Sequence, residues 1–174
     1  MTQHITPIYQ GTIIDLNIEE VRLPDGRMFD LEIVRHPGGA ATVAVDDKAR
    51  VCLLRQYRHA AGGWLWELPA GKLDPDEAPR ITAERELQEE AGLAAKQWNT
   101  LNSMISSPGV FTEVIHLFLA RGLSSVNAQT EDQECIEVHW LPFPEALSWA
   151  SEEKIVDAKT VIGLYRAQTF LQGA

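Results

Sequence analysis

The segment from Gly71 to Leu93 constrains the fold most, because it combines a clear helix signal with an unusual concentration of acid. Pro79 suits the first turn of a helix and Gly92 suits a C-terminal cap, so the segment predicts a helix over 79–91. A stripe of small and apolar residues is spaced to pack on a sheet: Ala83, Leu87 and Ala91. Seven carboxylates occupy the segment: Asp74, Asp76, Glu77, Glu84, Glu86, Glu89 and Glu90.

Three of these acids share one side of the predicted helix. At about 100° per residue, Glu86 and Glu90 lie about 40° apart, and Glu89 lies about 60° to the other side of Glu86. Carboxylates about 4 Å apart repel by about 4 kcal/mol at an effective dielectric of about 20. Solvation, protonation or a divalent cation can offset this repulsion. If a divalent cation offsets it, Mg²⁺ or Mn²⁺ are the ions that such oxygen ligands suit.

The composition narrows the class of protein. A chain of 174 residues suits one domain, or one domain with a small appendage. A net charge of −10 argues against non-specific binding to nucleic acid or to an anionic membrane. The two cysteines lack a metal-type spacing, the first residues do not form a signal peptide, and no apolar run approaches the ~20 residues of a membrane span. We therefore expect a cytoplasmic protein with neither nucleic acid nor membrane as partner.

The remaining pattern predicts more strands than helices, which indicates an α+β fold with a mixed sheet around the acidic helix. Residues 11–36 predict two strands around a turn, and residues 40–58 predict a hairpin. Further strands are expected in these ranges: 64–71, 98–106, 114–123 and 135–143. Two closing helices are expected at 144–152 and 157–172. We expect an N-terminal antiparallel strand pair within 1–36, a candidate dimerisation appendage, and a main domain over 37–174.

The spacing of the acidic segment resembles the Nudix box, G-x5-E-x7-R-E-U-x-E-E-x-G-U, where U is a bulky aliphatic residue. Every fixed position of that pattern is present here: Gly71, Glu77, Arg85, Glu86, Leu87, Glu89, Glu90, Gly92 and Leu93. The resemblance implies an α/β/α sandwich in which the box forms a loop, a helix and a second loop. It also implies Mg²⁺-dependent hydrolysis of a nucleoside diphosphate linked to another group.

Residues outside the box point to one group of that superfamily. The stretches LLRQYRHAAGGWLWELPAGKLDPDE and SSPGVFTE resemble ADP-ribose pyrophosphatases, and Pro108 stands where that group carries its characteristic proline. The resemblance implies cleavage of ADP-ribose or a related nucleoside diphosphate sugar. Leu31 replaces an arginine frequent in close relatives, which favours a broader range of sugars. The alternatives are hydrolysis of a nucleoside triphosphate or dinucleoside polyphosphate, or a non-catalytic sensor of ADP-ribose.

The resemblance also implies roles for individual residues. The implied metal ligands are the carbonyl of Ala70 and the carboxylates of Glu86, Glu90 and Glu134. The implied catalytic residues are Glu89, Arg85 (which orients Glu89), Glu134 and Asp132. For the base in the late acidic loop, Glu134 is favoured first, then Asp132, then Glu131. The implied substrate contacts are Glu32, Arg55, Arg58, Pro108 and Glu113. Glu77 is interpreted as a brace between the loop and the helix, and the expected assembly is a homodimer.

Overall fold

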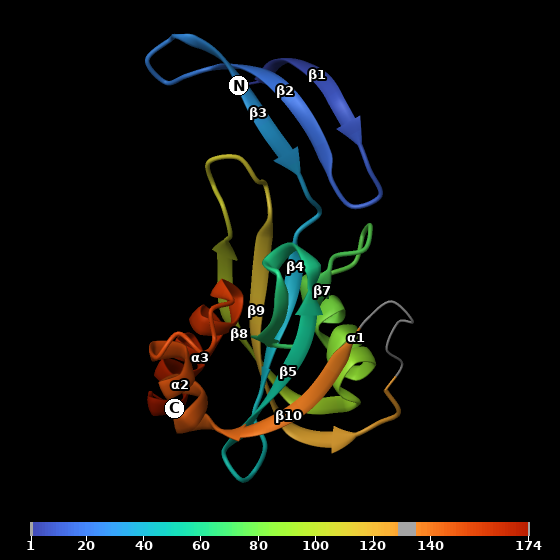
Figure 1. Cartoon of the computed structure of the whole chain (residues 1–174), viewed down its shortest axis with the longest axis vertical. Coiled ribbons are helices and arrows are strands. Elements are labelled where there is room, and N and C mark those ends of the chain that lie inside the picture. The colour runs from blue at the N-terminus through green and yellow to red at the C-terminus, as the bar shows by residue number, and fades with distance from the viewer. Residues whose placement is uncertain (1, 129–134, 174) are drawn as a thin grey trace. The chain divides into compact units, whose positions relative to one another are not determined.

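The computed structural model describes residues 2–128 and 135–173, which fall into two compact units. Unit 1 combines Met1–Gly38 with Ile105–Val114, and unit 2 combines Gly39–Met104 with Ile115–Ala174. The segment Ile105–Val114 therefore belongs with the N-terminal strands, although it is distant from them in sequence. Figure 1 shows the elements of both units.

Unit 1 is a three-stranded antiparallel sheet in the order β1-β2-β3. Its strands have these bounds: β1 Thr2–Gln10, β2 Asp15–Arg22 and β3 Met28–Arg35. The expected pair around the Pro24–Gly26 turn is present as β2 and β3. β1 was not expected from the sequence; it contains Pro7, a residue that weakens a strand pattern. Its position agrees with that weakness, since β1 is an edge strand with a register shift between Pro7 and Tyr9.

Unit 2 contains two sheets, in the orders β10-β5-β6 and β7-β4-β9-β8. The first sheet contains β5 Arg50–Arg58, β6 Gly63–Glu67 and β10 Ile136–Pro142. The second contains β4 Gly39–Ala44, β7 Ala70–Lys72, β8 Leu93–Ile105 and β9 Val114–Ser125. The second sheet is mixed, because β4 runs parallel to β9 and antiparallel to β7. The short 3-10 helix η1 His59–Ala61 joins β5 to β6.

The expected hairpin over 40–58 is wrong in its pairing. Both of its strands exist, but β4 and β5 belong to different sheets and share only an isolated bridge between Val45 and Val51. β4 is buried along its whole length, and its hydrogen-bonded neighbours are β7 and β9. A turn between two apolar runs predicts a hairpin, but here the two strands separate after the turn to pair with distant segments.

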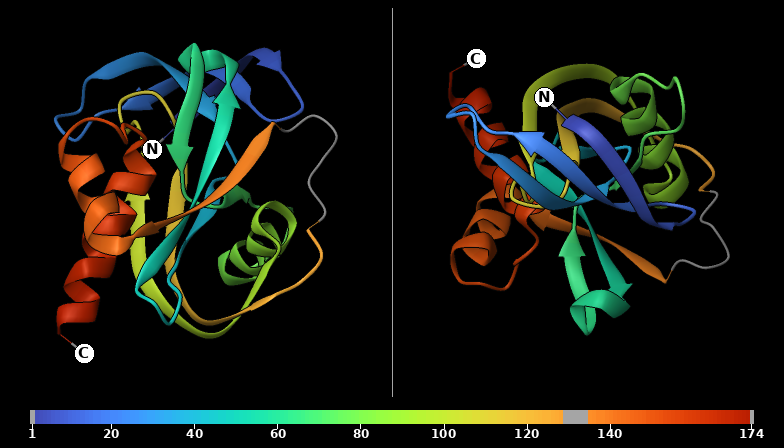
Figure 2. Two further views of the ribbon diagram at one scale, coloured as in Figure 1. Left: turned by 60° about the horizontal axis from the view of Figure 1, so that its bottom comes forward. Right: turned by 90° about the horizontal axis from the view of Figure 1, so that it is seen from above.

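Helices cover the strands of unit 2 from opposite sides, as Figure 2 shows for α1 on one side and α2 and α3 on the other. Their bounds are α1 Pro79–Ala91, α2 Phe143–Ser151 and α3 Ala158–Gln172. This arrangement confirms the expected α+β class and the α/β/α sandwich. No helix in the described residues is long and apolar enough to cross a membrane.

Two apolar clusters hold these layers together. The larger lies on the side of α2 and α3 and includes Val43, Leu53, Leu117 and Leu164. The smaller lies on the side of α1 and includes Leu87, Cys52 and Ala120. Gly163 lets α3 approach the sheet closely, because a Cβ built there would lie 2.7 Å from the Leu68 side chain. Burial of this apolar surface on both sides of the strands fixes α1 in place.

Candidate active site

The helix α1 has the limits that its sequence predicts. Pro79 stands at its N-terminal end, and Gly92 caps the other end at a φ of 63°, a left-handed conformation that glycine adopts without steric cost. Ala83 and Leu87 are fully buried against the sheet. The Oγ1 of Thr42 donates to the Ala83 carbonyl at 3.3 Å, which also ties the helix to β4. Packing of this apolar stripe sets which acids of α1 turn inward.

Glu90 is drawn into the interior with that stripe. The residue is 2% exposed, and its Oε2 accepts the backbone N–H of Ala70 at 2.7 Å. Ala70 lies opposite Ala41 in the β7–β4 ladder, at a position where its N–H turns away from β4. Because the N–H and C=O of one strand residue point to the same edge, the carbonyl of Ala70 is on the edge that faces Glu90. The predicted ligands Glu90 and Ala70 are thus neighbours.

Gly71 makes room for the next acid of the box. A Cβ built on Gly71 would coincide with the carboxylate of Glu86, whose side chain is 13% exposed. The close approach of backbone to carboxylate therefore requires a residue without a side chain at this point. Glu86 and Glu90 both lie against β7, one turn of α1 apart.

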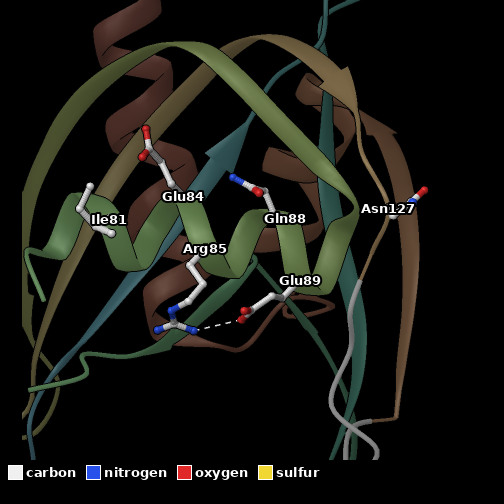
Figure 3. A pocket seen from close by; sticks show the side chains of 6 residues that line it. All are labelled: Ile81, Glu84, Arg85, Gln88, Glu89 and Asn127. Atoms are coloured by element: carbon white, nitrogen blue, oxygen red, sulfur yellow. Dashed lines mark hydrogen bonds and ion pairs between the residues drawn. The ribbon is translucent and has the colours of Figure 1, made fainter.

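Arg85 forms ion pairs with three acids of the box. Its guanidinium contacts Glu77 at 3.1 Å, Glu86 at 2.7 Å and Glu89 at 3.0 Å. Figure 3 shows the Arg85–Glu89 pair at the spacing expected from the sequence. Hydrogen bonds from Arg85 and then from Thr82 hold the pKa of Glu77 below its ordinary value. Hydrogen bonding to Glu77 raises the pKa of Arg85 further, so this group stays a cation.

Glu77 occupies the position of a brace. It lies in the loop before α1, accepts a hydrogen bond from the Thr82 hydroxyl at 2.7 Å and pairs with Arg85 on the same helix. Its carboxylate thus joins the loop to the first two turns of α1. The loop contributes a further acid, since Asp74 lies 3.8 Å from Arg85.

A hollow of about 290 Å³ lies on the outer face of α1. Figure 3 shows its lining, which consists of Ile81, Glu84, Arg85, Gln88, Glu89 and Asn127. Glu86 and Glu90 are not part of it, because they lie on the helix face that approaches β7. Among the acids at the fixed positions of the box, only Glu89 borders the hollow, and its side chain is 36% exposed. Of these fixed-position acids, Glu89 is therefore the most accessible to water.

A second group of charges, which sequence reasoning missed, surrounds Glu67 at the end of β6. Glu67 is 2% exposed, and Arg58 binds its two oxygens at 2.8 and 3.0 Å. Lys159 at the start of α3 also contacts Glu67, and it contacts Asp157 at 3.0 Å. Burial would raise the pKa of Glu67, but its hydrogen bonds from Arg58 and the charge of Lys159 hold that pKa below its ordinary value. The only sequence signal was an acid inside the apolar run WLWEL.

The two predicted arginines of β5 lie on opposite faces of the strand, because they are three residues apart. Arg58 pairs with Glu67, and this hydrogen bond raises the pKa of Arg58, with a smaller contribution from the charge of Glu90. Arg55 instead lies over the Trp64 ring at 5.2 Å and contacts Glu137 at 3.4 Å. The structure thus brings Arg58 toward the box and directs Arg55 away from it.

Three predicted substrate contacts belong to unit 1. Glu32 is exposed on β3, opposite Ile18 of β2. Pro108 is exposed in the segment Ile105–Val114. Glu113 lies at the end of that segment, 3.6 Å from Nδ1 of His36. The predicted loop acids Glu131, Asp132 and Glu134 lie outside the described residues, so their roles stay predictions.

The donor set of the box fits a small, hard divalent cation. Carboxylates and a backbone carbonyl are the oxygen ligands that such ions prefer, and Gly71 leaves the space that Glu86 needs. Within residues 2–128 and 135–173, no three His, Cys, Asp or Glu side chains converge closely enough to hold a metal alone. A cation that keeps several waters and is held by one or two carboxylates and substrate phosphates suits such a site.

Comparison with known proteins agrees with this geometry. The NUDIX domain model matches residues 35–161. The chain is 39% identical to a methanol dehydrogenase activator of Bacillus methanolicus, and the match covers 92% of this chain and 88% of that protein. It is 37% identical to an ADP-ribose pyrophosphatase of Bacillus subtilis (strain 168), with the same coverage. A solved ADP compounds hydrolase superposes with a TM-score of 0.85 at 18% identity, covering 99% of this chain and 94% of that one.

Proposed function

The chain belongs to the NUDIX domain family, and from this premise we propose that it is a hydrolase of ADP-ribose or related nucleoside diphosphate sugars. Cleavage of the diphosphate yields a nucleoside monophosphate and a sugar phosphate. The likeness to an ADP-ribose pyrophosphatase over 92% of this chain supports this substrate class. The observation that carries the proposal is the placement of Glu86 and Glu90 against β7, with the Ala70 backbone beside them.

Glu86, Glu90 and the carbonyl of Ala70 would hold Mg²⁺, with Mn²⁺ as the alternative, and we propose Glu134 as a further ligand. When bound, such an ion neutralises charge on the diphosphate and lowers the pKa of a water molecule. Arg85 keeps Glu86 and Glu89 in fixed orientations through contacts at 2.7 and 3.0 Å. These contacts reduce the repulsion among the box acids and hold the Glu86 carboxylate where it can bind a cation.

A carboxylate then takes the proton of the water that attacks phosphorus. Glu89 is one candidate, because it is partly exposed and is oriented by Arg85. Glu134 and Asp132 are the other candidates, favoured in that order within the late loop. Arg58 is proposed to bind the diphosphate, since a guanidinium can bridge two phosphate oxygens.

Further contacts are proposed for residues outside the box. In unit 1, these are Glu32, Pro108 and Glu113. In unit 2, Arg55 stays a proposed contact, although its side chain packs on Trp64. A Glu32→Ala variant tests the first of these, and an increase in KM for ADP-ribose is expected with kcat little changed. An unchanged KM for ADP-ribose would argue against a substrate contact at Glu32.

We also propose a homodimer located in the cytoplasm. Unit 1 exposes apolar side chains that a second copy can cover: Ile5, Ile8, Tyr9, Ile13 and Phe29. Both cysteines are free, which suits a reducing compartment. Sedimentation at several concentrations tests the assembly. A single species of 19.4 kDa throughout would exclude the dimer.

The test of the proposed function is a substrate panel with Mg²⁺ and with a chelator. It contains ADP-ribose, ADP-glucose, GDP-mannose, UDP-glucose, a dinucleoside polyphosphate and a nucleoside triphosphate. Release of monophosphate from ADP-ribose or another nucleotide sugar, dependent on the cation, is the expected result. A preference for the triphosphate or the dinucleotide would instead favour the alternative hydrolases. Binding of ADP-ribose without turnover would identify a sensor, which the complete set of box acids argues against.

A further inference from the structure

The buried carboxylate of Glu67 has two cationic partners of different accessibility. The side chain of Arg58 is 41% exposed, whereas that of Lys159 is 13% exposed. Arg58 therefore reaches solvent while it holds Glu67, and Lys159 contacts Glu67 from within the protein. A carboxylate buried at 2% exposure requires at least one cation or several donors to stay ionised at low cost.

Lys159 is itself held in place by the start of α3. Asp157 caps this helix by accepting the Thr160 N–H at 3.0 Å, and it contacts Lys159 at 3.0 Å. The fully buried Thr160 hydroxyl accepts the backbone N–H of Leu68 at 2.9 Å. The first turn of α3 thus fixes both the Glu67 carboxylate and the backbone immediately after it.

That backbone leads directly to the box. Pro69 accepts the N–H of Thr42 at 2.9 Å, and the next residue, Ala70, donates its N–H to Glu90. Glu67 therefore lies three residues from the contact that places Glu90.

We propose that Lys159 is a positioning residue that keeps Glu67 neutralised while Arg58 turns from Glu67 to the diphosphate of the substrate. The inference deepens the proposed function and rests on its assignment of Arg58 to the diphosphate. With Lys159 present, Glu67 retains a cation after Arg58 departs. Without Lys159, Glu67 has neither of its two cations once Arg58 moves to the diphosphate. Substrate binding then has to overcome the free-energy cost of a buried, unpaired carboxylate.

The test is a double-mutant cycle on binding of α,β-methylene ADP, whose diphosphate cannot be hydrolysed at the bridging carbon. Calorimetric titration with Mg²⁺ present gives Kd for wild type, Lys159→Met, Glu67→Gln and the double variant. Lys159→Met is expected to weaken binding at least about tenfold, because Arg58 stays on Glu67. In the double variant Glu67 carries no charge, so binding is expected to recover to within about threefold of Glu67→Gln alone.

Controls separate this role from a purely structural one. Lys154→Met removes an exposed lysine that pairs with Glu152, and it is expected to leave Kd unchanged. Lys159→Arg keeps the charge and is expected to restore most of the affinity. Circular dichroism checks the fold of each variant, and Lys159→Gln replaces Lys159→Met if the apolar side chain prevents folding. With ADP-ribose as substrate, the loss in Lys159→Met is expected mainly in KM rather than in kcat.

The outcomes distinguish the inference from the function on which it rests. If wild type hydrolyses nucleotide sugars but Lys159→Met binds the analogue normally, the role of Lys159 is wrong and the function stands. The same holds if the double variant binds no better than Lys159→Met. If wild type hydrolyses none of the nucleotide sugars while the four Kd values behave as expected, the proposed function is wrong. The role of Lys159 in freeing Arg58 for the diphosphate then stands. If wild type does not bind the analogue, the inference is wrong.

Discussion

The cluster around Arg85 and the cluster around Glu67 both join arginine to carboxylates in unit 2, but their charge balances differ. Four carboxylates lie within 4 Å of Arg85: Asp74, Glu77, Glu86 and Glu89. Lys72 pairs with Asp74 at 2.8 Å, which gives two cations for four acids in these contacts. Around Glu67 the contacts join two cations, Arg58 and Lys159, to two acids, Glu67 and Asp157.

The excess of acids around Arg85 suits the binding of a cation, whereas the charges around Glu67 balance one another and stabilise the fold. In the described contacts the acids near Arg85 outnumber the cations, and Glu90 adds a further acid one turn of α1 from Glu86. A divalent ion reduces such a surplus. In the contacts around Glu67 the cations and the acids are equal in number, so a further cation would be bound only weakly there. The acidity of a segment is thus less informative than the balance of charges that the fold brings together.

The largest expected effect comes from Glu90→Gln, which keeps the shape of the side chain but removes its charge. The turnover of ADP-ribose with Mg²⁺ is expected to fall by roughly 10²- to 10³-fold, because a ligand charge is lost where the diphosphate is neutralised. Steady-state kinetics over a range of Mg²⁺ concentrations measures the loss. Thermal unfolding is expected to show that the fold persists.

Glu84→Gln is the matched control for that variant. Glu84 lies on the same helix but on its outer side, where it pairs with Arg80. The same chemical change there is expected to leave turnover unchanged. Equal losses from Glu84→Gln and Glu90→Gln would contradict the distinction between the two faces of α1. Near-normal turnover in Glu90→Gln would remove the metal site from this helix altogether.

Gly71→Ala is expected to have the next largest effect. The added methyl occupies the place of the Glu86 carboxylate, so that side chain has to move away from β7. A turnover loss of about 10- to 100-fold is expected, with an increased requirement for Mg²⁺. Gly63→Ala is the control, because a Cβ at Gly63 meets no atom within 4 Å. If both variants turn over substrate at the wild-type rate, Glu86 does not depend on the space at Gly71.

Local signals in the sequence predicted α1 completely, whereas distant contacts escaped prediction. Pro79, Gly92 and the buried stripe specify the helix by themselves, and they place Glu86 and Glu90 on one face. The pairing of β4 with β9 depends on residues far along the chain, so a turn between β4 and β5 suggested a hairpin instead. Glu67 gave no local signal of its role, because its partner Lys159 is 92 positions away.

The pH dependence of stability tests the cluster around Glu67. The pKa of Glu67 in the folded protein is held below its ordinary value of 4.5 by Arg58 and Lys159, against the effect of burial. Its ionised form therefore stabilises the fold above about pH 4.5, and this contribution is lost as the pH falls through the folded pKa. Wild type is expected to lose more stability than Glu67→Gln between about pH 7 and about pH 4. Urea unfolding at both pH values measures the difference. If wild type and Glu67→Gln lose the same free energy of unfolding, the ionised Glu67 is not stabilised by its cations.

The smallest expected effect concerns the stability of Glu84→Gln. Its pair with Arg80 has the spacing of four residues on an exposed helix face, where such pairs contribute about 0.3–0.5 kcal/mol. Arg80 also lies over the Trp98 ring at 4.4 Å, so the guanidinium keeps a partner after the substitution. The free energy of unfolding in urea is therefore expected to fall by a few tenths of a kcal/mol, and by less in high salt because the pair is screened. A loss above about 1 kcal/mol would mean that the Glu84–Arg80 pair contributes more than an ordinary helix-surface ion pair does.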